Sequence, residues 1–256
     1  MEDWNVTLYR QFEKERVQPS VDLVKRIEGD SFKRIIDIGC GSGMSTLPLR
    51  NRFKEAEIFG ADSSPSMLTQ AKETVKDVTW LERDCSKPMD DLGRFDLIFS
   101  NAALQWFENQ AKVIKNLSGM LQPKGLLAVQ IPYFSAMTIA DCIEKAVQTY
   151  DPDIFKGIEK DLHRSYAPGF YYDILTNHFC KIELWQTNYF HLMNAPEDIL
   201  EFCMSTGLRP YANRFAENQK AEFYTKVLNE IKKGYTVQKD GKILFEFKRI
   251  FFIGMK

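Results

Sequence analysis

A glycine-rich turn directly after an apolar run is the feature that most constrains the fold of this chain. Residues 34–38 form the run, which is typical of a buried strand, and Gly39, Gly41 and Gly43 follow it at alternate positions. A helical pattern then begins over residues 47–53. Glycines accept positive φ angles and let the backbone approach a ligand closely. Strand, turn and helix together therefore predict a nucleoside- or phosphate-binding site.

The spacing of the glycines and one acidic residue indicate which ligand is bound. A dinucleotide-binding turn requires a glycine at the position that Met44 occupies, which argues against a nicotinamide cofactor. Asp37 would repel a pyrophosphate but suits a cation such as a sulfonium or an ammonium group. The pattern Asp37-x-Gly39-x-Gly41-x-Gly43 resembles motif I of the class I S-adenosylmethionine-dependent methyltransferases, which implies S-adenosyl-L-methionine as the cofactor. A glycine-rich turn of another α/β enzyme is the alternative interpretation.

Acidic residues follow the next two predicted strands. Asp62 comes after residues 57–61, where a carboxylate in a doubly wound sheet accepts the ribose hydroxyl hydrogens. Asp84 comes after residues 78–82, where the exocyclic amine of an adenine would need an acceptor. A helix-start carboxylate and a surface turn are the respective alternatives. The predicted cofactor-binding residues are Asp37, Gly39, Gly41, Gly43, Asp62, Ser63, Asp84, Cys85 and Asn101.

Strand and helix patterns alternate as far as residue 131, with a fourth strand predicted over residues 95–100, a turn at Pro123-Lys124-Gly125 and a fifth strand over the apolar run 126–131. This alternation predicts a parallel sheet with right-handed crossovers. Helical and aromatic stretches follow, and two late strands near residues 185 and 248 could pair antiparallel at the sheet edge. We expect an α/β, Rossmann-like class I methyltransferase fold, with a mostly parallel seven-stranded sheet, an antiparallel edge strand and a helical cap. We expect a single domain over residues 1–256, with a cofactor-binding core at 30–131 and substrate cap insertions at 132–180 and 192–240.

Composition excludes several other functions. The chain has 256 residues and a net charge of −1, without a basic cluster, so nucleic acid is not an expected partner. Five scattered cysteines and three histidines lack metal-ligand spacing, so we expect reduced thiols and no metal. Neither a secretory signal nor a membrane span is visible, which favours a cytoplasmic protein without a membrane partner. No obligate protein partner is evident.

Several stretches outside the glycine turn form distinctive motifs that span the chain: Trp4-Asn5 with Tyr9, Phe12, Arg16 and Pro19; Ser100 to Trp106; Tyr171 to Leu175; Trp185-x-Thr187-x-Tyr189-x-His191; Thr206 to Tyr211; and Asp240 to Leu244 with Phe247-x-Arg249. Together these stretches resemble the trans-aconitate methyltransferases. The resemblance implies a cytoplasmic enzyme that esterifies one carboxylate of trans-aconitate with the methyl group of S-adenosylmethionine. The aromatic residues at the amino terminus would either pack a helix on the sheet or form a flap over the cofactor.

One loop departs from that family pattern and leaves alternatives open. The family usually reads Pro-Asp-Asn and then Glu-Pro-Ser-His after the fifth strand, whereas this chain has Pro132-Tyr133-Phe134-Ser135-Ala136-Met137. This loop should face the substrate. A methyltransferase acting on a carrier-protein-bound malonyl group, or on another small molecule, is therefore the nearest alternative. A non-catalytic nucleoside-binding protein that keeps the fold is the second.

The expected chemistry needs no catalytic residue. A carboxylate is already ionised at neutral pH, so positioning and desolvation should supply the rate enhancement. A polyanionic acceptor needs cations and hydrogen-bond donors, and the predicted substrate-binding residues are Arg209, Trp106, Tyr171, His191 and Gln105. Arg209 is the first choice, with capping of the preceding helix as its alternative role. For His191 the alternative is a structural histidine, and for Trp106 it is a pocket wall. Either Tyr171 or Tyr172 should be a packing residue.

Overall fold

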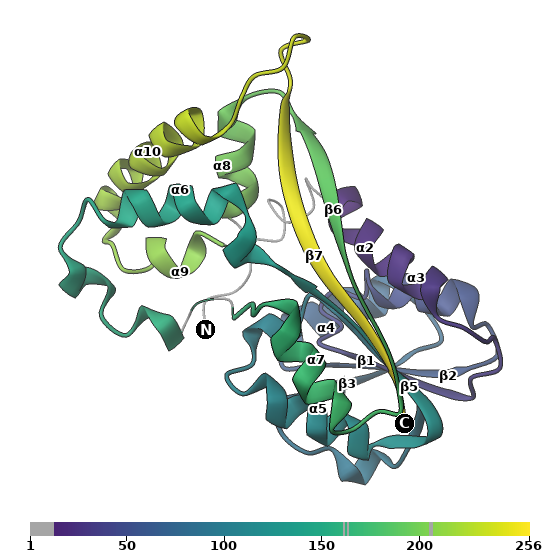
Figure 1. Ribbon diagram of the computed structural model, residues 1–256. Helices are drawn as coiled ribbons and strands as arrows, with labels where there is room; N and C mark the ends of the chain where they lie inside the picture. The colour runs from purple at the N-terminus through teal and green to yellow at the C-terminus, as the bar shows by residue number, and fades with distance from the viewer. Residues whose placement is uncertain (1–12, 161, 163, 205–206) are drawn as a thin grey trace. The chain divides into compact units, whose positions relative to one another are not determined.

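The computed structural model describes residues 13–160, 162, 164–204 and 207–256 (Figure 1). The chain divides into two compact units. The sheet unit consists of residues 14–132, 166–187 and 249–256, and the helical unit of residue 13 and the described residues within 133–165 and 188–248. The amino-terminal residues Trp4, Tyr9 and Phe12, considered above as a flap, lie outside the described residues.

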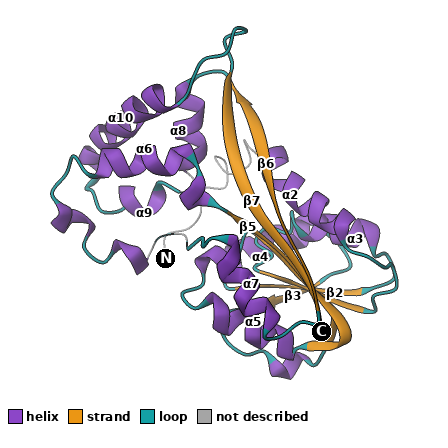
Figure 2. Cartoon of the chain, in the orientation of Figure 1, coloured by secondary structure: helices purple, strands orange, loops and turns teal. Residues whose placement is uncertain are grey.

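A seven-stranded sheet in the order β3-β2-β1-β4-β5-β7-β6 organises the fold (Figure 2). The chain runs outward from β1 to β3, returns to β4 on the other side of β1, and continues to β5. These five strands pair in parallel, as predicted. Their bounds are β1 Arg34–Ile38, β2 Glu57–Asp62, β3 Thr79–Glu82, β4 Phe95–Asn101 and β5 Leu121–Pro132.

The two late strands complete the sheet. Strand β7, Ile243–Met255, pairs antiparallel with β5. Strand β6, Lys181–Met193, lies beside β7 at the edge, so the expected pairing of the two late strands is confirmed. The antiparallel strand β7 therefore stands one place in from the edge. Residues 125–132 of β5 and 249–254 of β7 are continuously buried because both faces of the sheet are covered there.

Helices cover both faces of the sheet. The α7 residue Tyr171 stacks on Phe252 of β7, with ring centroids 5.7 Å apart. On the other face, the α2 residue Arg26 lies over Trp185, which in turn stacks on Phe251. Because neighbouring residues of a strand point to opposite faces, α2 and α7 lie on opposite sides of the sheet. The helices of this unit are α2 Glu13–Arg26, α3 Thr46–Arg52, α4 Pro65–Thr74, α5 Gln110–Gly119 and α7 Pro168–Thr176.

Helix α7 differs from the expected domain organisation. Residues 132–180 were all expected in a cap insertion, but residues 166–180 belong to the sheet unit. The physical reason is that α7 buries Tyr171 and Leu175, two apolar positions one helical turn apart. An aromatic-rich stretch of mixed pattern could not be assigned to this helix from its sequence alone.

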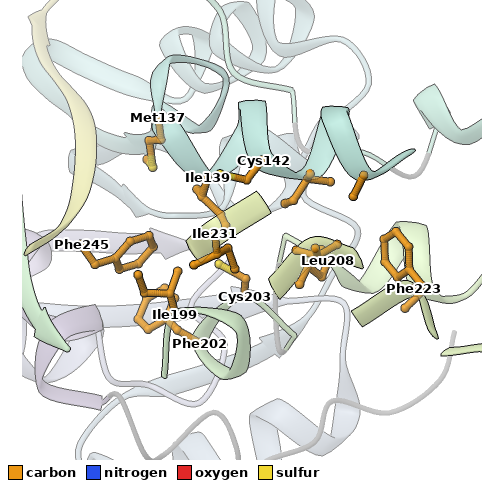
Figure 3. Packing of buried hydrophobic residues seen from close by; sticks show 14 of the residues in the cluster. Met137, Ile139, Cys142, Ile199, Phe202, Cys203, Leu208, Phe223, Ile231 and Phe245 are labelled. Carbon is orange, nitrogen blue, oxygen red and sulfur yellow. The ribbon is translucent and has the colours of Figure 1, made fainter. Parts of the chain in front are cut away.

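The helical unit has a hydrophobic core of its own (Figure 3). Helix α10 packs against α6 and α8, and their buried side chains meet Phe245 from the distal part of β7. Fully buried members include Ile139, Ile199, Phe223 and Ile231. The helices of this unit are α6 Thr138–Val147, α8 Pro196–Met204, α9 Arg209–Ala212 and α10 Glu217–Gly234. Within the described part of the chain, every helix is too short or too polar to cross a membrane.

Candidate functional site

The glycine turn lies at the topological switch point of the sheet, where the strand order reverses. Strands β2 and β4 flank β1 on opposite sides, and the chain winds away from β1 both ways. In open α/β sheets, ligands bind outside the carboxyl ends of the strands at such a switch point. The turn between β1 and α3 therefore occupies the expected position of a ligand site.

Asp37 is the buried acid of this site. Its side chain has no exposed surface, and Ser45 Oγ and Thr46 Oγ1 donate to its Oδ2 at 2.8 and 2.7 Å. Its Oδ1 is buried without a hydrogen-bond partner. Burial raises the pKa of Asp37 from an ordinary 3.8 to about 7; the two hydroxyl groups oppose the rise and Asp62 adds to it. A cation placed beside Oδ1 would restore the ionised form.

Asp62 ties the glycine turn to the end of β2. Its Oδ2 accepts from the Gly41 backbone N–H at 2.9 Å, and its Oδ1 accepts from the Ser64 N–H at 2.9 Å. Each carboxylate oxygen retains a second acceptor site, so both bonds are compatible with ribose binding. The side chain of Ser64 also caps α4, accepting from the Met67 N–H. Asp62 is therefore a loop anchor as well as a candidate cofactor ligand.

The turn is open beside Gly41. Gly39, Gly41 and Gly43 have φ angles of +69°, +52° and +84°, which side chains rarely adopt. A Cβ added at Gly41 would meet nothing within 4 Å, whereas a Cβ at Gly39 would lie 2.3 Å from Ala103 Cβ. Gly41 thus leaves backbone accessible beside the Asp62 carboxylate. The open turn and the unpartnered Asp37 Oδ1 fit a cationic nucleoside cofactor such as S-adenosyl-L-methionine.

The predicted residues near the end of β3 are less closely linked to the turn. Asp84 is exposed, and its carboxylate accepts from Ser86 and pairs with Lys87 at 3.2 Å. Hydrogen bonding from Ser86 is the main cause that holds the pKa of Asp84 below its usual range. The hydrogen bond and the positive charge of Lys87 make smaller contributions in the same direction. Cys85 is buried, which raises its thiol pKa to about 12, and Ser63 is exposed. A cofactor role for Ser63, Asp84 and Cys85 stays a prediction.

Cys40, in the glycine turn, is also buried. Burial likewise raises the pKa of the Cys40 thiol well above its usual range, so Cys40 is a neutral packing group. Across the described ranges, the His, Cys, Asp and Glu side chains form no group of three or more that could hold a metal ion.

The end of β4 bends sharply at the carboxyl edge of the sheet. Asn101 is half-buried, and its Oδ1 is buried without a hydrogen-bond partner. Ala102 follows with a φ of +52°. Its carbonyl oxygen accepts a hydrogen bond from Gln105 Nε2 at 2.6 Å. Gln105 is buried in the short helix η2, Leu104–Trp106, while Trp106 is 39% exposed. This geometry favours Gln105 as a residue that holds the bend, and it leaves Trp106 available as a pocket wall.

The other predicted substrate residues lie in different units. Tyr171 in the sheet unit is fully buried, and its hydroxyl donates to Gln110 Oε1 at 2.9 Å, which favours a packing role. His191 in the helical unit stacks on Phe202 at 5.8 Å, within the aromatic core. Arg209, also in the helical unit, is the first residue of α9 and is half-buried. Helix α8 ends at Met204, before Arg209. Roles of Tyr171, His191 and Arg209 in substrate binding stay predictions.

Four polar residues of the buried sheet region were not predicted from sequence. Ser45 and Thr46 bind Asp37, and Gln130 and Arg249 are buried in β5 and β7. Their signal was present: hydroxyl residues at the start of the helix after the turn, a glutamine inside the apolar run 126–131, and an arginine inside an apolar strand. A polar residue interrupting a buried strand needs a partner, and this is the reason to single it out.

Comparison with known proteins agrees with this geometry. A family model described as a methyltransferase domain matches residues 36–129. Proteins named trans-aconitate 2-methyltransferase from Escherichia coli strain 55989 and from Shigella flexneri are each 34% identical over 257 residues, covering 100% of this chain and 99% of the relative. Both alignments include the helical unit as well as the glycine turn.

Solved structures share the fold at low sequence identity. The YcgJ protein from Bacillus subtilis is 18% identical with a TM-score of 0.60, covering 93% of this chain and 98% of that one. Phosphoethanolamine N-methyltransferase 2 from Haemonchus contortus, solved with S-adenosyl-L-methionine, is 17% identical with a TM-score of 0.56, covering 93% of this chain and 52% of that one. With the glycine turn, the switch-point location and full-length relatives in agreement, this chain belongs to the trans-aconitate 2-methyltransferase family of S-adenosyl-L-methionine-dependent class I methyltransferases.

Proposed function

We propose that this protein transfers a methyl group from S-adenosyl-L-methionine to one carboxylate of a small polycarboxylic acid, with trans-aconitate as the first candidate. The observation that carries the proposal is the extent of the match. Relatives of that name align over the whole chain, including the helical unit that the methyltransferase domain match does not reach. A relative that shared only the cofactor region would support the cofactor but not the acceptor.

The residues proposed to hold the cofactor are those around the glycine turn. Asp37 offers a buried carboxylate oxygen for a cationic group, Asp62 offers lone pairs for the ribose, and Gly41 leaves room for the nucleoside. Asp84 is proposed for the adenine amine. When bound, S-adenosyl-L-methionine supplies a methyl group on a positively charged sulfur. The chain itself has to orient the acceptor and exclude water.

The acceptor needs no general base. Carboxylic acids with a pKa near 4 are ionised at neutral pH and are already nucleophilic. Opposite charges are neutralised as the methyl group moves, so a dry site favours the reaction more than water does. Good alignment can supply effective molarities of roughly 10⁵ M or more. We therefore propose that the side chains act by orientation and desolvation rather than by proton transfer.

Arg209 is the proposed acceptor ligand of the helical unit. A guanidinium group recognises a carboxylate through two parallel hydrogen bonds, which a lysine cannot reproduce. Replacing Arg209 by Ala should raise the KM for trans-aconitate roughly 10- to 100-fold and leave the affinity for S-adenosyl-L-methionine unchanged. Arg214, another half-buried arginine in the same unit, provides the matched control Arg214→Ala. Equal KM values in the two variants would remove Arg209 from the site.

A turnover assay tests the function as a whole. Purified protein is incubated with S-adenosyl-L-methionine and, separately, with trans-aconitate, citrate, isocitrate or malonate. Mass spectrometry then detects a methyl ester and S-adenosylhomocysteine, and Gly41→Val serves as the cofactor-site control. We expect a monomethyl ester of trans-aconitate to form fastest.

Two other outcomes have distinct meanings. Cofactor binding without an ester from any free acid would refute the small-acid assignment, and a malonyl group attached to a carrier protein would be assayed next. Absence of cofactor binding would instead favour a non-catalytic protein that keeps the fold.

A further inference from the structure

Two charged side chains stand out by their burial in the sheet unit. Among the described residues, Asp37 and Arg249 are the only charged side chains that are nearly fully buried, with 0% and 5% of their surface exposed. An arginine keeps its charge at any physiological pH, so its burial is costly unless an anion or several acceptors lie nearby. Asp37 belongs to the cofactor turn described above.

The strand register places Arg249 at the carboxyl edge of the parallel strands. It pairs with Pro132, the last residue of β5, because β7 runs antiparallel. Gln130, two residues before Pro132, pairs with Phe251 on β7 and with Asn101 at the end of β4. Paired residues in a sheet point to the same face, as do residues two apart in one strand. Arg249, Gln130 and Asn101 therefore project from one face.

Asp37 projects from that same face. It pairs with Phe99 of β4, two residues before Asn101. A row of polar side chains thus crosses β1, β4, β5 and β7, with a carboxylate at one end and a guanidinium group at the other. The anionic end suits a cationic cofactor, and the cationic end suits an anionic acceptor. The charges of the two ends are therefore complementary to those of the two reactants of a carboxylate methylation, the cationic cofactor and the anionic acceptor.

The amide between the two ends of this row has buried polar atoms without a hydrogen-bond partner. Gln130 has no exposed surface, and both its Oε1 and its Nε2 are buried without a hydrogen-bond partner. Asn101 Oδ1 beside it is also buried without a partner. Buried amides are almost always hydrogen-bonded, so an orphaned pair of amide atoms needs an explanation. A carboxylate could accept from the Gln130 amide and from the neighbouring guanidinium group together.

We propose that Arg249 and Gln130 form a subsite that binds one carboxylate of the acceptor acid. This inference rests on the proposed function and adds to it a cation from the sheet unit, Arg249, as a second proposed acceptor ligand in addition to Arg209. A polycarboxylic acid carries more than one negative charge, and a site with a single cation would leave one of them in a dry environment without a partner. The subsite also selects against acceptors that have only the reacting carboxylate.

Three substitutions test the subsite. Arg249→Met removes the charge, Arg249→Lys keeps it but loses the planar fork, and Gln130→Met replaces the amide by an apolar side chain of similar size. For Arg249→Met we expect the KM for trans-aconitate to rise about 30-fold or more, with an intermediate rise for Arg249→Lys. For Gln130→Met we expect a rise of roughly tenfold. The affinity for S-adenosyl-L-methionine, measured by calorimetry, should not change in any of the three.

Arg26→Met is the matched control. Arg26 also lies on this side of the sheet, over Trp185, but it is exposed and pairs with Glu183 at 3.1 Å. Its replacement should leave the KM for trans-aconitate unchanged. Binding is also measured without turnover, as the rise in Tm that trans-aconitate produces in the presence of S-adenosylhomocysteine. That rise should persist in Arg26→Met and disappear in Arg249→Met.

Gln130→Met separates a binding role from a structural one. Replacing an unsatisfied buried amide by an isosteric apolar group should raise the Tm of the ligand-free protein by roughly 2 to 4 °C. This variant should therefore fold even if Arg249→Met does not. An unchanged KM in Gln130→Met, or in a folded Arg249 variant, would overturn the subsite. The proposed function would still hold if the wild type esterified trans-aconitate. If the wild type esterified none of the acids, the proposed function and the subsite would fall together.

Discussion

Two of the glycines in the turn, Gly39 and Gly41, lack a side chain for different physical reasons, and substitution can separate them. At Gly39, an added Cβ would lie 2.3 Å from Ala103 Cβ, so the constraint is packing between β1 and the end of β4. At Gly41, only the φ of +52° opposes a side chain. We expect Gly39→Ala to lower the free energy of unfolding by about 2 to 4 kcal/mol, from overpacking plus strain. Gly41→Ala should cost about 1 kcal/mol.

Cofactor affinity should show the opposite order. Gly41→Ala is expected to weaken S-adenosyl-L-methionine binding at least about tenfold, because the methyl group would occupy space that the nucleoside needs. Calorimetric titration and urea unfolding of both variants measure the two effects. Adding Ala103→Gly to Gly39→Ala should recover the part of the stability that the clash removed. A Gly41→Ala variant with unchanged affinity would place the cofactor away from this part of the turn.

Asp37 should make the cofactor-free protein less stable as the pH rises. Its pKa is raised from 3.8 to about 7, so the folded protein holds a proton that the unfolded chain has released. Stability is therefore fully present below pH 4, is lost progressively as the pH rises toward 7, and is constant above that. The loss is on the order of 4 kcal/mol. Asp37→Asn should abolish this dependence, and the difference between wild type and variant in urea unfolding at pH 5 and pH 8 measures it.

The same proton links pH to cofactor binding. If a cationic group lies beside Asp37, binding restores the carboxylate and releases the proton at pH 6. Titrations in two buffers of different ionisation enthalpy would detect that release, which Asp37→Asn should lack. Equal heats in both buffers for the wild type would mean that Asp37 does not face the cationic part of the cofactor.

At the scale of elements, the hydroxyl of Tyr171 joins α7 to α5. It donates to Gln110 Oε1 at 2.9 Å in a fully buried position. We expect Tyr171→Phe to lower the free energy of unfolding by about 1 to 3 kcal/mol, because it removes a donor from a buried amide. The KM for trans-aconitate should not change. A double-mutant cycle with Gln110→Leu measures the coupling, and a raised KM with unchanged stability would restore Tyr171 as a substrate residue.

Elements with a regular apolar pattern could be located from the sequence, and irregular ones could not. The predicted strand 34–38 coincides with β1, and the others of the parallel sheet begin or end within a residue or two of prediction, except β5. Strand β5 starts at Leu121 rather than at residue 126, because Leu121 already pairs with Phe95 of β4. The register then shifts and pairing with β4 resumes at Leu126, with Lys124 at a φ of +65° in between. Pro123 and Gly125 suggested a turn there, and local turn signals cannot show that a neighbouring strand overrides them.

The candidate site could be predicted only in part, for a related reason. Asp37 and Asp62 follow from their place at strand ends, since the carboxyl edge of a parallel sheet is fixed by the order of elements. Gln105 stays a predicted substrate residue, but the hydrogen bond that its Nε2 donates to the Ala102 carbonyl oxygen was not predicted. Gln130 and Arg249 come from strands that are far apart in sequence. Their common face depends on the register between β5 and β7, which no local pattern contains.

For the whole molecule, the main feature is that each unit has its own core. The core of the helical unit includes Phe223, which is fully buried, whereas Leu127 is fully buried within the sheet unit. Strands β6 and β7 each have residues in the sheet unit and in the helical unit, so the chain crosses between the two units several times. The relative contributions of the two cores can therefore be separated only by placing a cavity in one at a time. A Phe or Leu to Ala change in a core costs about 2 to 5 kcal/mol, a large part of the stability of an ordinary domain.

We expect Phe223→Ala to lower hydrogen-exchange protection in residues 133–165 and 188–248 and to leave it intact around the glycine turn. Cofactor affinity should be retained, because the turn, Asp37 and Asp62 all belong to the sheet unit. Leu127→Ala should do the reverse, lowering protection in the sheet unit and weakening cofactor binding. Exchange measured by mass spectrometry on both variants compares the two patterns directly. If Phe223→Ala lowered protection equally in both units, the shared strands would make the molecule unfold as one cooperative body. The cofactor site would then depend on the helical core for its stability.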